Sequence, residues 1–328
     1  MSAQSSVSEE APPPYMDTGK QRECVSLDDI FGHPALVITW RAEPAYVGRW
    51  GADRRSPSVA KINMHLLTTD GTKVAVSAST GNVVHVLDVN TGKQVGKFKS
   101  GNSPHENVYS KDGSKLYHAS IGYVFTPLDP QFFDWTKGER VVQVVDTSNY
   151  QVIKKFNMAD KLKAAGLGKL SPAVRPMAHT PDEKFFYFQL SFLHGFVEYD
   201  MVNDKVTRLA KLPNLVPDLP LEQYVNDSAH HGIAMNAAGT KLCVAGTMDD
   251  YVAVVDRATF GYQLLQGLGQ KPYWVTSNKA GDRCYVSWSG TDQMSVIDYA
   301  SSIEVARVDV GRHPQRIREG YAPGNWMN

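Results

Sequence analysis

The residues best suited to do chemistry stand in two short motifs that lie far apart in the chain, PHEN at residues 104–107 and HHG at residues 230–232. Imidazole nitrogens and carboxylate oxygens are ligands of Zn, Fe, Cu and Mn. The same groups serve as general acids and bases where no metal is bound. The separation of the two motifs along the sequence does not show whether they lie close together. That depends on the secondary-structure elements that carry them.

Those elements are the strands of an internal repeat. One landmark is a turn signal, Asp70-Gly71 in the first copy, which recurs at residues 112, 182, 238 and 280, each time before a β-rich run. The other is an apolar strand that ends in an aspartate, at Asp88, Asp146, Asp200, Asp256 and Asp298. The commonest spacings, 18 and 24 residues, together make a unit of 42 residues. A period of about 40 residues filled with short strands is typical of β-propeller blades.

Three stretches carry a resemblance to a known repeat family. They are TTDGTKVAVSASTGNVVHVLDVNTGKQVGKF, MNAAGTKLCVAGTMDDYVAVVDRATF and NKAGDRCYVSWSGTDQMSVIDYASSIEVARVDVG. The repeat resembles that of the YVTN-type propellers, the group that includes YncE-like proteins, over residues 58–322. The resemblance implies a β-propeller and leaves the function open, because such propellers include enzymes, enzyme subunits and scaffolds.

We therefore predict an all-β fold, a β-propeller of four-stranded antiparallel blades. Five copies are readable, and GRHPQRIREGYAPG at the C-terminal end supplies the innermost strand of a sixth blade. Its outer strands are expected from ECVSL, PALVITW and AYVGRW near the N-terminus, which closes the ring and removes exposed sheet edges. Six blades are favoured, and seven is the alternative if residues 21–57 hold a divergent blade. Residues 1–20, rich in Ser, Glu and Pro, are expected to form a disordered tail, and residues 21–328 one domain.

The repeat predicts which side chains surround the propeller axis. Seven positions before each turn signal stand Asn63, His105, Arg175, His231, Tyr273 and Gln315, and one residue later Met64, Glu106, Pro176, Gly232, Trp274 and Arg316. This ring is polar and differs from blade to blade. Unlike polar side chains that converge on one axis are what a small-molecule site requires.

Roles follow from side-chain chemistry. His105 and His231 are the predicted metal ligands, with Glu106 as a carboxylate ligand or general base. Glu106, His230 and Tyr273 form the predicted catalytic set. The predicted substrate-binding residues are Asn63, Arg175, Trp274 and Arg316.

Other interpretations of the same residues stay open. The histidines could form a metal-free acid–base site, or merely hydrogen-bond across a water-filled channel. Arg175 could pair with a substrate anion or with Glu106. His118 is expected in the core, His179 between blades, and His194 as a weaker candidate for the site.

Three insertions depart from the 42-residue unit, at residues 121–140, 158–172 and 213–227. All fall in connections on one face of the propeller, so we expect them to form a partial roof over the axis. The second contains a short helix-like stretch, ADKLKAAG.

Composition excludes several classes of protein. Lys plus Arg and Asp plus Glu both number 34, which speaks against a nucleic-acid binder. No apolar run is long enough to span a membrane. The N-terminus lacks the pattern of a signal peptide, so a cytoplasmic location is expected. Cys24, Cys243 and Cys284 have no metal-type spacing and are interpreted as small buried residues in a reducing compartment.

No P-loop, GxGxxG, GxSxG or CxxCH motif occurs, so no nucleotide or haem cofactor is expected. The leading hypothesis is a cytoplasmic enzyme that acts on a small-molecule substrate in the central funnel, with a divalent transition metal as its candidate cofactor. The alternative is a non-catalytic scaffold that binds a partner protein through the loop-decorated face, with the aromatic residues of 121–138 as the contact.

Overall fold

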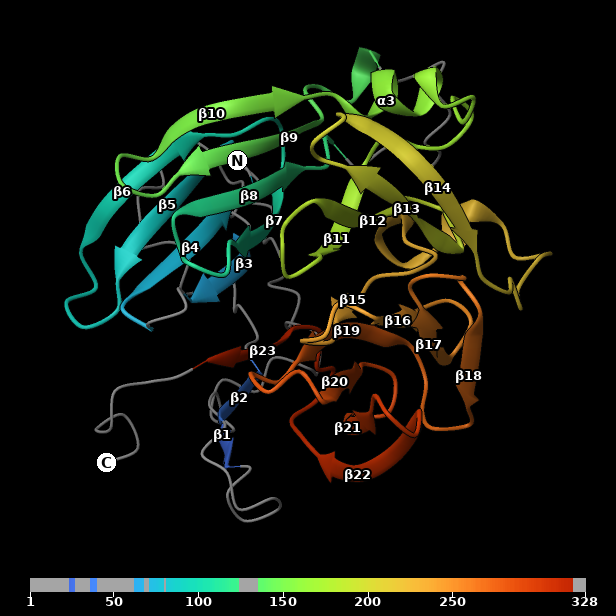
Figure 1. Ribbon diagram of the computed structural model, residues 1–328. Coiled ribbons are helices and arrows are strands. Elements are labelled where there is room, and N and C mark those ends of the chain that lie inside the picture. The colour runs from blue at the N-terminus through green and yellow to red at the C-terminus, as the bar shows by residue number, and fades with distance from the viewer. Residues whose placement is uncertain are drawn as a thin grey trace, which may run out of the picture.

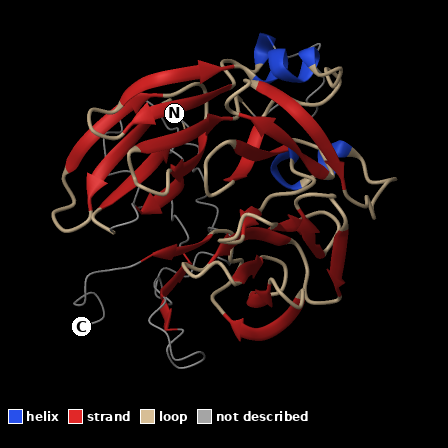
Figure 2. Cartoon of the chain, in the orientation of Figure 1, coloured by secondary structure: helices blue, strands red, loops and turns tan. Residues whose placement is uncertain are grey.

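The computed structural model describes residues 71–79, 81–123 and 135–318. It also describes the backbone of residues 319–320 and of three strands, β1 (Cys24–Ser26), β2 (Leu36–Thr39) and β3 (Ile62–Leu67). The regular structure of these residues is almost entirely β-strand (Figure 2). The sheets fan out around a common centre, where β3, β7, β11, β15, β19 and β23 lie (Figure 1).

Five of the sheets have four antiparallel strands each, in the sequential order expected of propeller blades. The remaining strands of the first two blades are β4 (Lys73–Ala78), β5 (Val83–Asp88), β6 (Gln94–Lys99), β7 (Pro104–Tyr109), β8 (Lys115–Ser120), β9 (Val141–Asp146) and β10 (Gln151–Phe156). The third blade has β11 (Val174–His179), β12 (Phe185–Leu190), β13 (Gly195–Asp200) and β14 (Lys205–Lys211). The fourth and fifth have β15 (Ile233–Met235), β16 (Lys241–Gly246), β17 (Tyr251–Asp256), β18 (Tyr262–Gln266), β19 (Pro272–Ser277), β20 (Arg283–Trp288), β21 (Gln293–Asp298) and β22 (Ile303–Asp309).

A sixth sheet joins the two ends of the chain. Its innermost strand, β23 (Ile317–Gly320), pairs antiparallel with β2, and β2 pairs with β1. The predicted composite blade is therefore present in three strands, two of them from the expected segments ECVSL and PALVITW. The third segment, AYVGRW, lies outside the described residues, as does any further blade between residues 40 and 61. Closure of the ring between this sheet and the first blade stays a prediction.

The two sequence landmarks hold the turns together. Asp112 Oδ1 accepts hydrogen bonds from the Ser110 hydroxyl and from both the amide and the hydroxyl of Ser114, which holds the pKa of Asp112 well below its usual range. Gly113 completes this turn with φ at +73°, a conformation that L-residues rarely adopt. Asp256, at the end of β17, accepts from Thr259 in the same way. Carboxylates thus fix the chain reversals that repeat along the sequence.

Neighbouring blades pack through apolar and covalent contacts. Tyr117 of β8 packs edge-on against Phe186 of β12 at 4.6 Å between ring centroids. A disulfide joins Cys243 of β16 to Cys284 of β20, with 6.5 Å between their Cα atoms. Both cysteines are fully buried, as expected, but their bonding contradicts the expectation of free thiols. Their separation of 41 residues is close to the repeat, so equivalent positions of adjacent blades face each other.

The insertions behave differently from one another. Residues 158–164 form helix α3 (Met158–Ala164), whose buried face packs on the outermost strand β14, away from the axis (Figure 1). This corrects its expected place in a roof over the axis. The 213–227 insertion holds two short 3-10 helices, η2 (Leu221–Gln223) and η3 (Val225–Asp227). In the 121–140 insertion, residues 124–134 lie outside the described residues.

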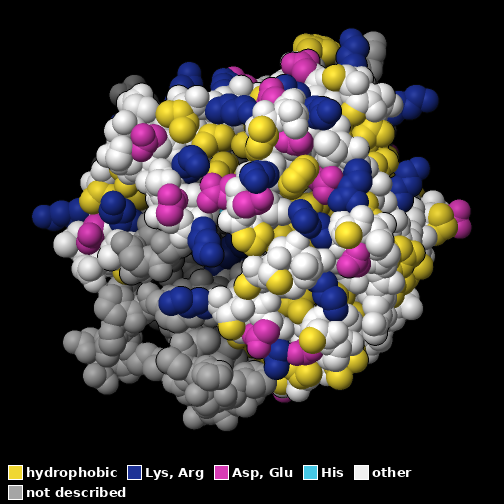
Figure 3. Space-filling model, viewed as in Figure 1, with side chains coloured by type: hydrophobic (Ala, Val, Ile, Leu, Met, Phe, Trp, Pro, Cys, Tyr) yellow, Lys and Arg dark blue, Asp and Glu magenta, His cyan; other side chains and the backbone are white. Residues whose placement is uncertain are grey.

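The surface carries interspersed charges of both signs on the face shown in Figure 3, in keeping with the balanced composition. Among the described residues, none of the helices is both long and apolar enough to cross a membrane.

Candidate functional site

Four of the innermost strands, β3, β7, β11 and β19, have a register irregularity near their first residues, whereas β15 and β23 pair with their neighbours without one. In β7 the pairing with β8 passes from Pro104 to Glu106 and leaves His105 as the extra residue. The same irregularity falls at Asn63 of β3 and at Tyr273 of β19, and in β11 it spans Arg175 and Pro176. A bulge re-aims a side chain and bends its strand. The irregularities thus coincide with four of the six positions that the repeat predicted to surround the axis, while His231 lies just before β15.

His105 and His231 meet face to face, although 126 residues separate them in the chain. Their Nε2 atoms are 3.2 Å apart, and their rings are nearly perpendicular at 5.1 Å between centroids. Both side chains are buried. Among the described residues, neither Nδ1 atom has a hydrogen-bond partner. The expected convergence of the two histidines is therefore present.

Aromatic rings and guanidinium groups surround the histidine pair. Tyr273 stacks on His231 at 4.3 Å, and the buried Trp274 lies 5.3 Å from the same ring. The guanidinium carbons of Arg316 and Arg318 lie 4.5 and 4.7 Å from the Trp274 ring. Such cation–π contacts are attractive and hold the guanidinium planes in place. We call this group the axial cluster; it comprises His105, Glu106, Arg175, His231, Tyr273, Trp274, Arg316 and Arg318.

The charges of the axial cluster differ from the predicted pairs. Glu106 Oε1 accepts a hydrogen bond from Arg318 Nη2 at 2.5 Å, so the alternative pair between Glu106 and Arg175 does not form. Arg175 instead donates from Nε to Ser191 at 2.9 Å, and its Nη2 lies 3.9 Å from Asp227 Oδ2. Three guanidinium groups thus face two carboxyl groups.

Burial dominates the ionisation of the cluster. Burial raises the pKa of Glu106 to about 7, against the opposing effect of Arg318 and Arg316. It holds the pKa of both His105 and His231 well below the usual range, and the positive charge of Arg316 acts in the same direction. The neutral form of both imidazoles is therefore favoured, and this is the form that can accept a proton.

The 213–227 insertion covers the axial cluster. Asn226 Nδ2 donates to the Tyr273 hydroxyl at 3.0 Å, and Val225 packs against Tyr273 and Trp274. Asp227 of the same short helix faces Arg175. The expected roof is therefore present for this insertion.

A second polar group lies beside the first. His194 Nδ1 is 2.7 Å and His230 Nε2 is 3.2 Å from the same atom, Asp249 Oδ2. We call His194, His230 and Asp249 the rim cluster. Their ligand atoms lie within 4.8 Å of one another, so the group has the composition and spacing to hold a metal ion. Burial alone would raise the pKa of Asp249, but hydrogen bonds from His194, His230 and the Leu215 amide lower it to about 2.

The rim cluster corrects one predicted assignment. His230 was expected beside His105 and His231, yet it faces Asp249 and the Tyr251 hydroxyl. Consecutive residues of an extended segment point to opposite sides, so His231 can reach the axis only if His230 turns away. His194, the weaker candidate, belongs to this cluster. Asp249 was missed, although its turn lies on the same face as that of His194.

The remaining candidates divide between core and site. His118 is buried and lies 2.9 Å from Asn107 and 3.0 Å from Ser120, which confirms its expected place in the core. His179 packs against Tyr117 and Phe186 between blades, also as expected. Asn63 lies at the bulge of β3, and its side chain is outside the described residues. Arg318 of β23 was not predicted, although it stands only two residues after Arg316, and residues two apart in an extended chain point to the same side.

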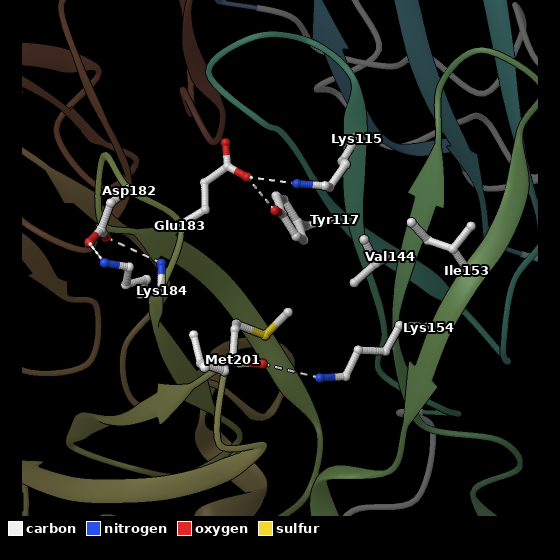
Figure 4. Close-up of a pocket in the computed structure, with 10 residues that line it drawn as sticks. Lys115, Tyr117, Val144, Ile153, Lys154, Asp182, Glu183, Lys184 and Met201 are labelled. Carbon is white, nitrogen blue, oxygen red and sulfur yellow. Dashed lines mark hydrogen bonds and ion pairs between the residues drawn. The ribbon is translucent and has the colours of Figure 1, made fainter.

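A surface pocket of about 340 Å³ lies elsewhere, between the second and third blades (Figure 4). Glu183 accepts a hydrogen bond from Tyr117 at 2.6 Å and one from Lys115 at 3.5 Å at its edge. This pocket contains none of the histidines of either cluster. Its polar groups pair with one another, so we do not place the site there.

Comparisons with known proteins define the class as an all-β propeller. No family model matches the chain, and no curated protein matches it. Among solved structures, the hydrazine synthase of Kuenenia stuttgartiensis is similar with a TM-score of 0.55 and 13% identity, over 85% of this chain and 82% of that chain. A structure of U3-55K is similar with a TM-score of 0.54 and 10% identity, over 77% of this chain and 66% of that chain. Likenesses at such low identity concern the fold alone.

Proposed function

We propose that this propeller is an enzyme that binds a small anionic molecule in the axial cluster and transfers protons with His105 and His231. One observation carries the proposal. The buried donors Arg316 Nη1 and Trp274 Nε1 have no hydrogen-bond partner among the described residues, although they lie in the same cluster. Leaving a buried donor unpaired costs about 1–3 kcal/mol, and more when it is charged. A carboxylate or phosphate group would supply the missing acceptor.

Each group then has a role. The anion would be attracted and oriented by Arg175, Arg316 and Arg318. Trp274 would pack against the apolar part of the substrate. His105 and His231, 3.2 Å apart, would each act in the neutral form as a base, and the ring that takes a proton from the substrate can return it as an acid. Glu106, with a pKa of about 7, can exchange a proton near neutral pH, and Tyr273 and Asn63 would orient the substrate.

The proposal places no metal ion on His105, His231 and Glu106. Three guanidinium groups close to the histidine pair disfavour a further positive charge there, because the interaction between charges is strong in a buried site. The axial chemistry is therefore proposed as metal-free acid–base catalysis.

Isothermal titration calorimetry with inorganic phosphate, malonate and citrate tests the proposal. Wild type should bind at least one of them, and Arg316→Gln should weaken that binding about 100-fold, or about 2.7 kcal/mol. Arg312→Gln is the matched control, because Arg312 is an exposed arginine of the same terminal segment. Equal affinity in the two variants, or no binding of any of these anions to wild type, would contradict the proposal.

We also propose that the protein works in an oxidising compartment and belongs to the YVTN-type propellers. Disulfides form and persist in oxidising compartments, so the Cys243–Cys284 bond favours such a location over the cytoplasm. The period of the repeat and the blade order support membership of the YVTN-type propellers.

A second candidate function is a scaffold that binds a partner protein. It is favoured by Trp135 of the 121–140 insertion, whose surface is 81% exposed. In that case Trp135→Ala should abolish capture of a partner that wild type retains from a lysate of its source. Ile303→Ser, at an exposed apolar residue of β22, should retain the partner. Retention of the partner by Trp135→Ala would exclude this contact.

A further inference from the structure

The rim cluster has the distances of a metal site before its ion enters. Its three candidate ligand atoms are His194 Nδ1, His230 Nε2 and Asp249 Oδ2, with separations from the carboxylate oxygen of 2.7 and 3.2 Å. Bond lengths of about 2.0–2.2 Å in a tetrahedral zinc site place neighbouring ligand atoms about 3.3–3.5 Å apart. To admit the ion, the shorter separation would widen by about 0.6–0.8 Å and the longer one by about 0.1–0.3 Å.

Outer hydrogen bonds already aim two of the ligands. His194 Nδ1 donates to Asp249 when no ion is bound, and its Nε2 lies 2.9 Å from the Tyr224 hydroxyl. An ion that takes the Nδ1 lone pair would leave the ring proton on Nε2, where the Tyr224 hydroxyl can accept it. Asp249 Oδ1 accepts from the Leu215 amide at 2.7 Å, which directs Oδ2 toward the histidines. Such outer partners are typical of metal sites and fix the orientation and tautomer of the ligands.

His230 supplies the third ligand atom. Its Nδ1 has no partner among the described residues, while Nε2 faces Asp249 and the Tyr251 hydroxyl. When Nε2 binds the ion, the ring proton of His230 stands on Nδ1, and the charge of the imidazole does not change.

The local charge also favours a cation. The charged or titratable groups that act on His230 are Asp249 and His194, whereas Arg316 and Arg175 act on His231. The Asp249 carboxylate gives the rim cluster a negatively charged group, whereas the axial cluster holds three guanidinium groups. His230 and Asp249 side chains are completely buried, and the His194 side chain is 11% exposed, which leaves one approach from solvent. A divalent ion is therefore better accommodated here than in the axial cluster.

The same residues connect the rim cluster to the insertion that covers the axial cluster. Leu215 and Tyr224 belong to the 213–227 insertion, and its Pro213 carbonyl accepts from the Tyr251 hydroxyl at 2.9 Å. The far end of the insertion holds Asn226 and Asp227 against the axial cluster.

We propose that His194, His230 and Asp249 bind one divalent transition-metal ion, and that this ion fixes the 213–227 insertion over the axial cluster. The metal site is independent of the proposed function. Only the expected effect of the ion on ligand binding in the axial cluster rests on the proposed function. By thermodynamic linkage, an ion that orders the insertion raises the affinity of the axial cluster for any ligand that binds only when the insertion is ordered.

Equilibrium dialysis of the full chain against Zn²⁺ alone, followed by elemental analysis, tests the site. Wild type should retain close to one Zn²⁺ per chain. His194→Ala and Asp249→Asn should lose it, and Tyr224→Phe should weaken it about 10-fold through loss of the outer hydrogen bond. His105→Ala is the matched control, because it removes a buried histidine of the axial cluster and should retain the ion. Failure of wild type to retain Zn²⁺, or retention by Asp249→Asn, would overturn the metal site.

Hydrogen exchange tests the effect on the insertion. Zn²⁺ should slow exchange of the amides of Leu215 and residues 224–227 in wild type and leave them unchanged in Asp249→Asn. Unchanged exchange in wild type loaded with Zn²⁺ would overturn the proposed fixation of the insertion. This readout needs no anion, so failure of the axial cluster to bind anions leaves the metal result intact and counts against the proposed function alone.

Discussion

Replacing both bonded cysteines, as Cys243→Ser with Cys284→Ser, is expected to lower the free energy of unfolding by about 4 kcal/mol, because the bond closes a loop of 41 residues in the unfolded chain. The bond also joins β16 to β20, so it restrains two blades that otherwise meet through side-chain packing. Urea unfolding of wild type and double variant at neutral pH measures the difference.

Cys24→Ser is the control for this experiment, because it changes the third cysteine and leaves the disulfide in place. Both bonded side chains are fully buried, so a reductant should act on wild type only at urea concentrations that open the structure. A difference in the free energy of unfolding below about 1 kcal/mol between wild type and double variant would refute the expectation.

The second large effect is a loss of stability in acid that His118 causes. Burial lowers the pKa of His118 to about 3, against an ordinary value of 6.5. The unfolded chain therefore binds one more proton than the folded chain between these values, and stability falls as the pH falls, by about 1.4 kcal/mol per pH unit. Above pH 6.5 the contribution is constant. His118→Gln should reduce the loss of stability between pH 6.5 and 5 by about 2 kcal/mol.

The control for His118 keeps the imidazole and removes a partner. Ser120→Ala deletes the hydroxyl 3.0 Å from Nε2, so it should lower stability at both pH values and preserve the pH dependence. Both variants retain the other buried histidines, and urea unfolding at the two pH values isolates His118. An unchanged pH dependence in His118→Gln would show that its burial does not control the titration.

Much of the fold could be predicted because the repeat reports on it directly. Each turn signal is held by its own carboxylate or glycine, and each apolar strand ends at the expected aspartate, as β9 does at Asp146. The repeat also placed His105 and His231 on equivalent positions of two innermost strands. Their approach to 3.2 Å agrees with that equivalence, because equivalent positions at the start of the innermost strands face the same axis.

The rest depends on side-chain directions that spacing leaves open. His230 and His231 are neighbours, and only the backbone at the start of β15 decides which of them faces the axis. The choice of partner for Glu106 depended on how close Arg318 of the last strand comes to β7. A metal-type spacing of cysteines does not predict the disulfide, because the bond joins equivalent positions of adjacent blades that lie side by side.

The bulges of the innermost strands allow the side chains at the axis to vary without a change in the strand pairing around them. Since the extra residue pairs with no partner in the neighbouring strand, an exchange there, such as histidine for asparagine, leaves the pairing of the strands intact. Relatives with the same repeat could therefore diversify their ligands one blade at a time, with little penalty to folding. A single scaffold would then accommodate a wide range of specificities by drift at a few interchangeable positions.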